Sequence, residues 1–159
     1  MAYDAHEDGR RDFHFLYGRW RVQHRRLRER GVGCDSWDEF EGVTFCQGLI
    51  GGLCNVDEND FPDRGVQGLS FRTFDAAIGR WSIYWVNSAS GGLQAPVHGR
   101  FENGIGLFHG EDVDGDRPVQ VTYLWDQITP SSARWSQAFS YDGGETWETN
   151  WTMSFTRTA

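Results

Sequence analysis

Apolar and polar residues alternate along most of the chain, in short runs separated by turn-forming residues. This period-two pattern is typical of half-buried β-strands. It predicts ten strands, over residues 19–30, 36–48, 52–59, 66–75, 80–87, 96–102, 105–111, 118–127, 132–141 and 147–157. One segment near the N-terminus has helical spacing instead, with Phe13, Leu16, Tyr17 and Trp20 at i, i+3, i+4 and i+7. This spacing predicts a short helix of about two turns that ends near Gly18.

The number of strands and the shortness of the turns narrow the fold class. Ten short antiparallel strands without a second helix indicate a sandwich or a closed barrel. A barrel has the advantage that it leaves no strand edge unpaired. We therefore predict an all-β fold.

The Asn103-Gly104 pair predicts a two-residue hairpin turn, for which it is the strongest short sequence signal. This turn sets His98 opposite His109 in the paired strands. The face of the hairpin that carries Phe101 is aromatic and uncharged, so we expect it to point inward.

The hairpin of residues 66–75 and 80–87 is predicted to have a four-residue loop in which Gly79 adopts a positive φ. The resulting register pairs Arg72 with Ile83 and places it on the same face as Trp81 and Trp85. Neither face is cleanly apolar, and we choose the tryptophan face as the inward one. An arginine there needs an internal carboxylate or a ligand anion, because an unpaired buried charge is costly. The internal candidates are Glu39, Glu41, Asp57 and Glu58.

The last hairpin needs an odd loop, because only an odd loop brings its two aromatic faces together. The expected register sets Gln137 opposite Trp151 and Trp135 opposite Met153. This predicts an aromatic inner wall in which Gln137 is the polar exception. The connecting residues 140–147 resemble an Asp-box, a hairpin motif of sialidase propellers, and we assign them a structural role in the turn.

The composition excludes several classes of protein. The chain has 159 residues, which is about one domain in length, and we treat residues 1–159 as a single domain. Its formal net charge of −8 argues against nucleic acid as a partner. All 15 basic residues are arginine, which excludes Schiff-base chemistry on lysine and a P-loop lysine.

The cellular environment is predicted from three features of the sequence. Residues 1–8 are acidic and contain no apolar stretch of a secretory signal. No apolar run approaches the ~20 residues needed to span a bilayer. The three cysteines, Cys34, Cys46 and Cys54, have no metal-ligand spacing and cannot all pair within one chain. We expect a reduced, cytoplasmic protein without a membrane partner or a metal site.

Several polar residues are candidates for a site inside the barrel. His24 shares a strand face with Trp20 and can lie in the interior, as hydrogen-bonded structure or as a functional group. Asn55 and Asp57 share strand parity and can present an amide and a carboxylate to the same interior. The basic run of residues 25–30 is either a solvated strand end or a rim that attracts anions.

Several segments, taken in order, resemble a known family. Gly18-Arg19-Trp20 followed by an antiparallel meander resembles the calycins, the class of lipocalin-related barrels. Residues 37–42, 52–58, 75–85 and 147–151 resemble a bacterial family of calycin-like proteins of unknown function. The resemblance covers nearly the whole chain. It implies an antiparallel barrel of 8–10 strands with an internal cavity.

The resemblance also suggests classes of ligand. Related calycin-like barrels bind heme, fatty acids or retinoids, and a few barrels of similar shape catalyse decarboxylation or cyclisation. The heme-binding relatives place a proximal histidine late in the chain, whereas no histidine follows His109 here. We therefore expect no cofactor.

The leading hypothesis is a barrel that binds a small hydrophobic, aromatic or polycyclic molecule bearing an oxygen. Apolar aromatic walls with a few convergent polar groups are typical of ligand cavities. The predicted walls are Trp20, Trp81, Trp85, Phe101, Trp135, Phe139 and Trp151. The predicted polar contacts are His24, Asn55, Asp57, Arg72 and Gln137, of which Arg72 would hold a ligand oxygen or carboxylate.

Two alternatives remain open. In the first, the cavity is the active site of a cofactor-independent isomerase, dehydratase or cyclase. His24 would exchange a proton, Arg72 or Gln137 would stabilise an oxyanion, and Asp57 would orient the substrate or act as a base. In the second, aromatic side chains fill the barrel and the protein acts through its surface, as a homodimer.

Overall fold

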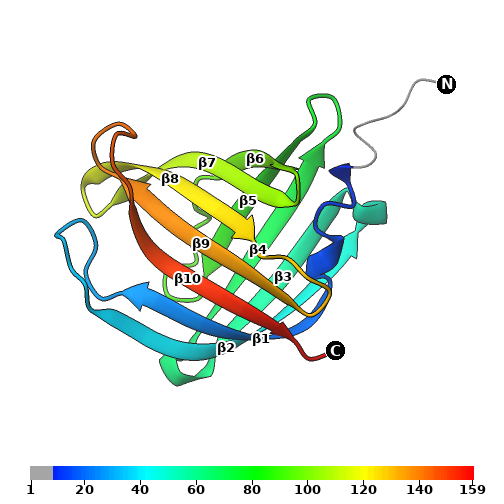
Figure 1. The fold of residues 1–159 in the computed structure, drawn as a ribbon, viewed down its shortest axis with the longest axis horizontal. Coiled ribbons are helices and arrows are strands. Elements are labelled where there is room, and N and C mark those ends of the chain that lie inside the picture. The colour runs from blue at the N-terminus through cyan, green and yellow to red at the C-terminus, as the bar shows by residue number, and fades with distance from the viewer. Residues whose placement is uncertain (1–8) are drawn as a thin grey trace.

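Ten antiparallel strands close into one barrel, in which each strand pairs with its neighbours in sequence and the first strand pairs with the last (Figure 1). This computed structural model describes residues 9–159, so the acidic segment 1–8 lies outside the described residues. The strands are β1 (Gly18–Leu27), β2 (Trp37–Leu49), β3 (Cys54–Phe61), β4 (Val66–Asp75), β5 (Arg80–Asn87), β6 (Val97–Glu102), β7 (Ile105–Asp114), β8 (Arg117–Asp126), β9 (Ser132–Ser140) and β10 (Glu148–Arg157).

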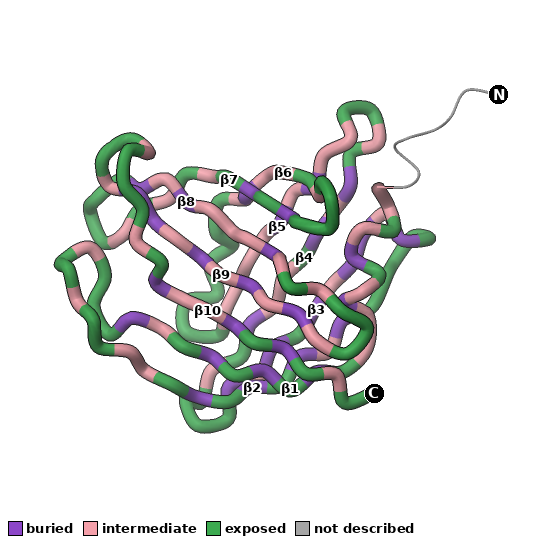
Figure 2. Tube along the Cα trace, viewed as in Figure 1, coloured by how far each residue is buried: buried purple, intermediate pink, exposed green. Residues whose placement is uncertain are grey.

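All ten predicted strands are present, and each observed end lies within three residues of the predicted one. Burial alternates along the strands as expected for a barrel with one face inside (Figure 2). In β1 it alternates through Trp20, Val22 and His24, and Leu27 at the strand end is buried as well. The all-β antiparallel barrel is therefore confirmed. None of the helices in residues 9–159 is long and apolar enough to cross a membrane.

The predicted N-terminal helix is only a 3-10 turn, η1 (His14–Leu16), and β1 begins directly after it at Gly18. The helical spacing of the apolar residues has a different cause. Phe13 and Leu16 are fully buried at the end of the barrel, and Trp20 is buried within β1. Two further 3-10 turns, η2 (Ile50–Gly52) and η3 (Pro62–Arg64), connect strands.

The registers predicted from the turns are confirmed. His98 lies opposite His109, and the turn residues Asn103 and Gly104 both have positive φ. Arg72 lies opposite Ile83, with Gly79 at φ 63°.

The last hairpin also has the predicted pairs: Gln137 faces Trp151, and Trp135 faces Met153. A bulge between Thr149 and Trp151 shifts the register on one side of these pairs. The inward face of β4 is the one that carries Arg72, which is buried, whereas Phe71 on the opposite face is exposed.

Phe13 closes one end of the barrel. Its ring packs edge-to-face on Trp81 and Phe101, at centroid distances of 4.9 and 5.0 Å, and lies 6.0 Å from the ring of Phe108. Trp20 belongs to the same apolar core cluster. Aromatic side chains therefore fill this end of the barrel, and the segment before β1 acts as its plug.

Candidate functional site

A cavity of about 290 Å³ lies inside the barrel, away from the plug. Its lining includes Arg26, Phe61 and Asn87, at the C-terminal ends of β1, β3 and β5. Phe13 packs against the other ends of the strands, near Trp81 at the start of β5. The second alternative, a barrel filled throughout by its own aromatic side chains, is therefore wrong for this half of the interior.

Aromatic side chains make up much of the wall. Trp135 and Trp151 meet edge-to-face at 5.5 Å, and Tyr123 meets Trp135 at 5.0 Å. Trp85 meets Trp151 edge-to-face at 6.4 Å. The remaining apolar lining residues are Phe61, Ile83, Val113, Trp125, Phe139, Met153 and Phe155. These rings hold one another in place, so the wall is preformed.

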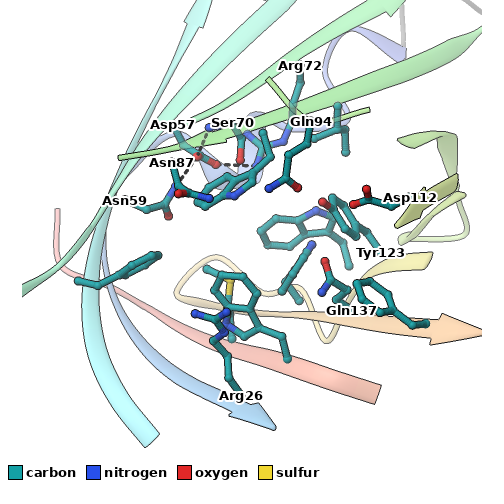
Figure 3. A pocket seen from close by; sticks show the side chains of 18 of the residues that line it. Arg26, Asp57, Asn59, Ser70, Arg72, Asn87, Gln94, Asp112, Tyr123 and Gln137 are labelled. Atoms are coloured by element: carbon teal, nitrogen blue, oxygen red, sulfur yellow. Dashed lines mark hydrogen bonds and ion pairs between the residues drawn. The ribbon is translucent and has the colours of Figure 1, made fainter. Parts of the chain in front are cut away.

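The guanidinium of Arg72 is a buried polar group in the lining of this cavity. Its Nη2 donates to Oδ2 of Asp57 at 2.5 Å (Figure 3). Its Nη1 donates to Oδ1 of Asn55 at 2.9 Å. The Arg72 side chain also lies over the Phe13 ring, with its central carbon 4.9 Å from the ring centroid. Arg72 is thus held between the cavity and the plug, and its charge is balanced by an internal carboxylate.

Asp57 is anchored on its other oxygen. Oδ1 accepts hydrogen bonds from Nδ2 of Asn59 at 2.6 Å and from the backbone N–H of Ser70 at 3.2 Å. The Thr44 hydroxyl donates in turn to Oδ1 of Asn59 at 2.6 Å. Both carboxylate oxygens of Asp57 are therefore engaged in hydrogen bonds.

His24 is fully buried but does not line the cavity. Its ring stacks on Phe40 at 4.8 Å, and its Nδ1 accepts a hydrogen bond from Nε1 of Trp151 at 3.1 Å. Burial, and then the charge of Arg26, lowers the pKa of His24 to about 3. His24 is therefore neutral at physiological pH, and it supports the Trp151 wall from behind.

Gln137 is a polar side chain within the aromatic wall. Its Nε2 donates to Oδ1 of Asn150 at 2.8 Å, and Asn150 is the residue at the β10 bulge. The carbonyl oxygen of Gln137 accepts no hydrogen bond from residues 9–159, so it remains available as an acceptor.

The mouth of the cavity carries charges of both signs. Arg26 on β1 and Asp112 on β7 line it (Figure 3). Arg30, just beyond the end of β1, lines it as well. Burial raises the pKa of Tyr123, which also lines the cavity, to about 12, and the Asp112 charge adds to this effect. The Tyr123 hydroxyl therefore stays protonated and can donate a hydrogen bond.

The predicted site residues fall into two groups in the structure. Seven of them line the cavity: Asp57, Arg72, Trp85, Trp135, Gln137, Phe139 and Trp151. The others point inward without reaching it. Trp20, Trp81 and Phe101 pack at the plugged end, Asn55 lies behind Arg72, and His24 lies behind Trp151.

Sequence reasoning missed several lining residues. Tyr123 and Trp125 share one face of β8 with buried Val119 and Val121, so the alternation of β8 could have identified them. For Arg26 the sequence allows either a solvated strand end or a rim that attracts anions, and the structure has it in the lining of the cavity. Parity with His24 separates Arg26 from Arg25 but not from Arg28 or Arg30, so the sequence alone could not single out Arg26.

A second depression lies on the outside of the barrel, over β1 to β5. Its lining includes Val43 and Val86 on outward faces, and Val43 is 53% exposed. It is a surface groove that is more open to solvent than the interior cavity. Within residues 9–159, no group of three or more His, Cys, Asp or Glu side chains could hold a metal ion.

Comparison with known proteins identifies the fold. No protein-family model matches the sequence, and no curated protein matches it. Among solved structures, the chain is similar to the S-type phycobiliprotein lyase CPES from Guillardia theta, with a TM-score of 0.59 and 10% sequence identity. The match covers 100% of this chain and 99% of the lyase chain. Together with the ten-stranded closed barrel, it confirms the predicted calycin-like fold.

Proposed function

We propose that this protein binds a small hydrophobic molecule, aromatic or polycyclic and bearing an oxygen, inside the barrel. The observation that carries the proposal is the preformed cavity, whose wall is mostly aromatic and whose polar groups are few and fixed. This combination is what recognition of such a ligand requires. Gln137 and Tyr123 are the proposed partners for the ligand oxygen, because one offers an acceptor and the other a donor.

The cavity limits the size of the ligand. At the packing density of protein interiors, about 0.75, a cavity of 290 Å³ takes about 220 Å³ of ligand atoms. That volume suits two or three rings. The likeness to a phycobiliprotein lyase makes a linear tetrapyrrole the largest ligand to consider, and part of such a molecule would protrude through the mouth.

Binding is favoured over acid–base catalysis by the positions of the two predicted catalytic groups. His24 does not line the cavity, and its low pKa makes it a poor proton acceptor near neutral pH. Asp57 lines the cavity, but both of its carboxylate oxygens are engaged in hydrogen bonds. The lining also contains no histidine that could ligate a heme iron.

The test is a titration of the purified protein with a panel of probes, in which binding is detected by the quenching of tryptophan fluorescence. The panel contains N-phenyl-1-naphthylamine, a fatty acid, hemin and biliverdin. Trp85, Trp125, Trp135 and Trp151 line the cavity, so a bound aromatic ring is expected to quench them. Saturable binding of the two- or three-ring probe supports the proposal, and failure of every probe to bind overturns it.

A further inference from the structure

Arg26 occupies an unusual position at the mouth of the cavity. It is half-buried, and its guanidinium carbon lies 4.4 Å from the ring centroid of Trp151, which also lines the cavity. This contact orients the side chain along the wall. The contact is with the ring and takes up none of the Arg26 N–H groups as hydrogen-bond donors.

The carboxylates near Arg26 are already paired with other groups. Asp38 lies directly opposite Arg26 in the β1–β2 register, but it accepts from Nε of Arg64 at 3.1 Å and from Nη2 of the same side chain. Asp114 accepts from Arg30 at 3.1 Å and from the Tyr141 hydroxyl at 2.7 Å. Arg26 itself makes no hydrogen bond or ion pair within residues 9–159.

The electrostatic surroundings of Arg26 disfavour its positive charge. Burial, and then repulsion from Arg30, lowers the pKa of Arg26, while Asp38 offsets this only in part. A half-buried cation whose neighbouring carboxylate is already paired with another group gains from an anion that reaches it. Arg72, at the other end of the cavity, offers no such gain because Asp57 already neutralises it.

The distribution of charge around the mouth also determines on which side of the mouth an anion is bound. Asp112 stands on β7, four strands away from β1 in the barrel order, and repels an anion from its side (Figure 3). An anion at the mouth is therefore directed toward β1 and β10. The aromatic lining lies directly below that position.

We propose that the ligand of this cavity is an aromatic acid, whose rings lie between the tryptophans and whose anionic group is bound by the Arg26 guanidinium at the mouth. This inference rests on the proposed function, since it assigns the chemical class of the ligand for the same cavity. Arg26 is then the residue that selects acids over neutral molecules of the same shape.

Two fluorescent probes that differ by one group test this selection. N-phenyl-1-naphthylamine is neutral, and 8-anilinonaphthalene-1-sulfonate is the same skeleton with a sulfonate. We expect the wild-type protein to bind the sulfonate more tightly, by about tenfold to a hundredfold, as for one charge-assisted contact. Mutual displacement of the two probes establishes that they share one site.

The variant to be compared is Arg26→Gln, with Arg25→Gln as the matched control. Arg25 is the adjacent residue on β1, is exposed, and pairs with Glu39 at 3.3 Å outside the barrel. Arg26→Gln is expected to abolish the preference for the sulfonate while the affinity for the neutral probe stays within about twofold. Arg26→Lys should retain part of the preference, and Arg25→Gln should change neither affinity.

The outcomes separate this inference from the proposed function. If both probes bind and Arg26→Gln leaves their affinity ratio unchanged, the assignment of Arg26 is overturned while ligand binding by the cavity stands. If the neutral probe binds and the wild-type protein shows no preference for the sulfonate, the assignment of an acid is likewise overturned. If neither probe binds, the proposed function fails and this inference fails with it.

Discussion

Arg72 and Asp57 form an ion pair inside the barrel, with Nη2 and Oδ2 2.5 Å apart and side chains only 4% and 5% exposed. The pair lies between the plugged end and the cavity, because Arg72 touches Phe13 on one side and lines the cavity on the other. It explains how a charged residue can occupy the aromatic interior without a bound anion. Its main contribution is therefore to the fold, and through the fold to the shape of the cavity.

Removing one partner of this pair should destabilise the protein strongly. Arg72→Met leaves the Asp57 charge buried without its cation, and the expected loss in free energy of unfolding is about 3–5 kcal/mol. Urea denaturation measures it. Arg25→Gln, which breaks an exposed pair with Glu39, should stay within about 0.5 kcal/mol of the wild type.

A double variant distinguishes loss of charge balance from loss of packing. Asp57→Asn removes the second charge and keeps an oxygen that can accept from Asn59 and Ser70. Combined with Arg72→Met, it should be more stable than Arg72→Met alone. Equal stability of the two variants would show that the ion pair is not the source of the effect.

His24 should make stability fall at acid pH. Its pKa is lowered to about 3 in the folded protein, while the unfolded chain keeps the ordinary value of 6.5. Below pH 6.5 the unfolded state therefore binds a proton that the folded state does not. The stabilisation is complete above pH 6.5 and declines as the pH falls toward 3, by about 1.4 kcal/mol per pH unit within that window.

The comparison with His24→Phe isolates this contribution. Between pH 7.5 and 5.0 the wild type should lose about 2 kcal/mol more than the variant, measured by urea denaturation at both pH values. The hydrogen bond from Trp151 is absent from the variant at every pH, so it shifts both of the variant's values equally. An identical pH dependence in the two proteins would mean that His24 is protonated normally in the folded state.

Filling the cavity should block ligand binding without unfolding the barrel. Ser70 lines the cavity opposite Trp85, and only its backbone N–H contacts Asp57. Ser70→Phe is expected to weaken binding of N-phenyl-1-naphthylamine by more than about tenfold while stability changes by less than about 1 kcal/mol. Ser154→Phe, at an exposed position on β10, is the matched control and should bind as the wild type does.

The side chain of Asp142 should stabilise the turn between β9 and β10. Its Oδ1 accepts from the Ser140 hydroxyl at 2.8 Å and from the Thr146 backbone N–H at 2.9 Å, and its Oδ2 accepts from the Thr146 hydroxyl. These bonds, those from Thr146 first, lower the pKa of Asp142 from 3.8 to about 2. The stabilisation of the turn is therefore present above pH 4 and is lost as the pH falls toward 2.

Hydrogen exchange of the Thr146 amide measures this effect. Asp142→Ala should reduce the protection factor of that amide by about tenfold, as for the loss of a charge-assisted hydrogen bond. Asp116→Ala, in the exposed turn of another hairpin, is the control and should leave it unchanged. Unaltered protection in Asp142→Ala would contradict the role of this carboxylate.

Much of the fold could be predicted from local sequence, because turns and alternation are local properties. The Asn103-Gly104 turn fixes the register of His98 and His109, and parity fixes the pairing of Gln137 with Trp151. Even the inward direction of Arg72 followed from its tryptophan neighbours. Each of these predictions needed only residues within one hairpin.

The position of the cavity along the barrel axis could not be predicted in the same way. The alternation of apolar and polar residues predicts whether a side chain points inward, but not how deep in the barrel it lies. Trp81 and Trp85 share a face of β5, yet Trp81 packs against the plug and Trp85 lines the cavity. The two positions differ because Phe13 fills the end of the barrel near Trp81. The helical spacing of the segment that contains Phe13 does not predict that its ring enters the barrel.

The central claim is that the ligand lies inside the barrel, and intermolecular NOEs from bound N-phenyl-1-naphthylamine test it most directly. The Met153 methyl group and the Ile83 methyl groups line the cavity, whereas the methyl groups of Val43 and Val86 line the outer groove. We expect NOEs from the probe rings to Met153 and Ile83 and none to the two valines. NOEs to Val43 and Val86 alone would place the probe on the outer surface and contradict the account.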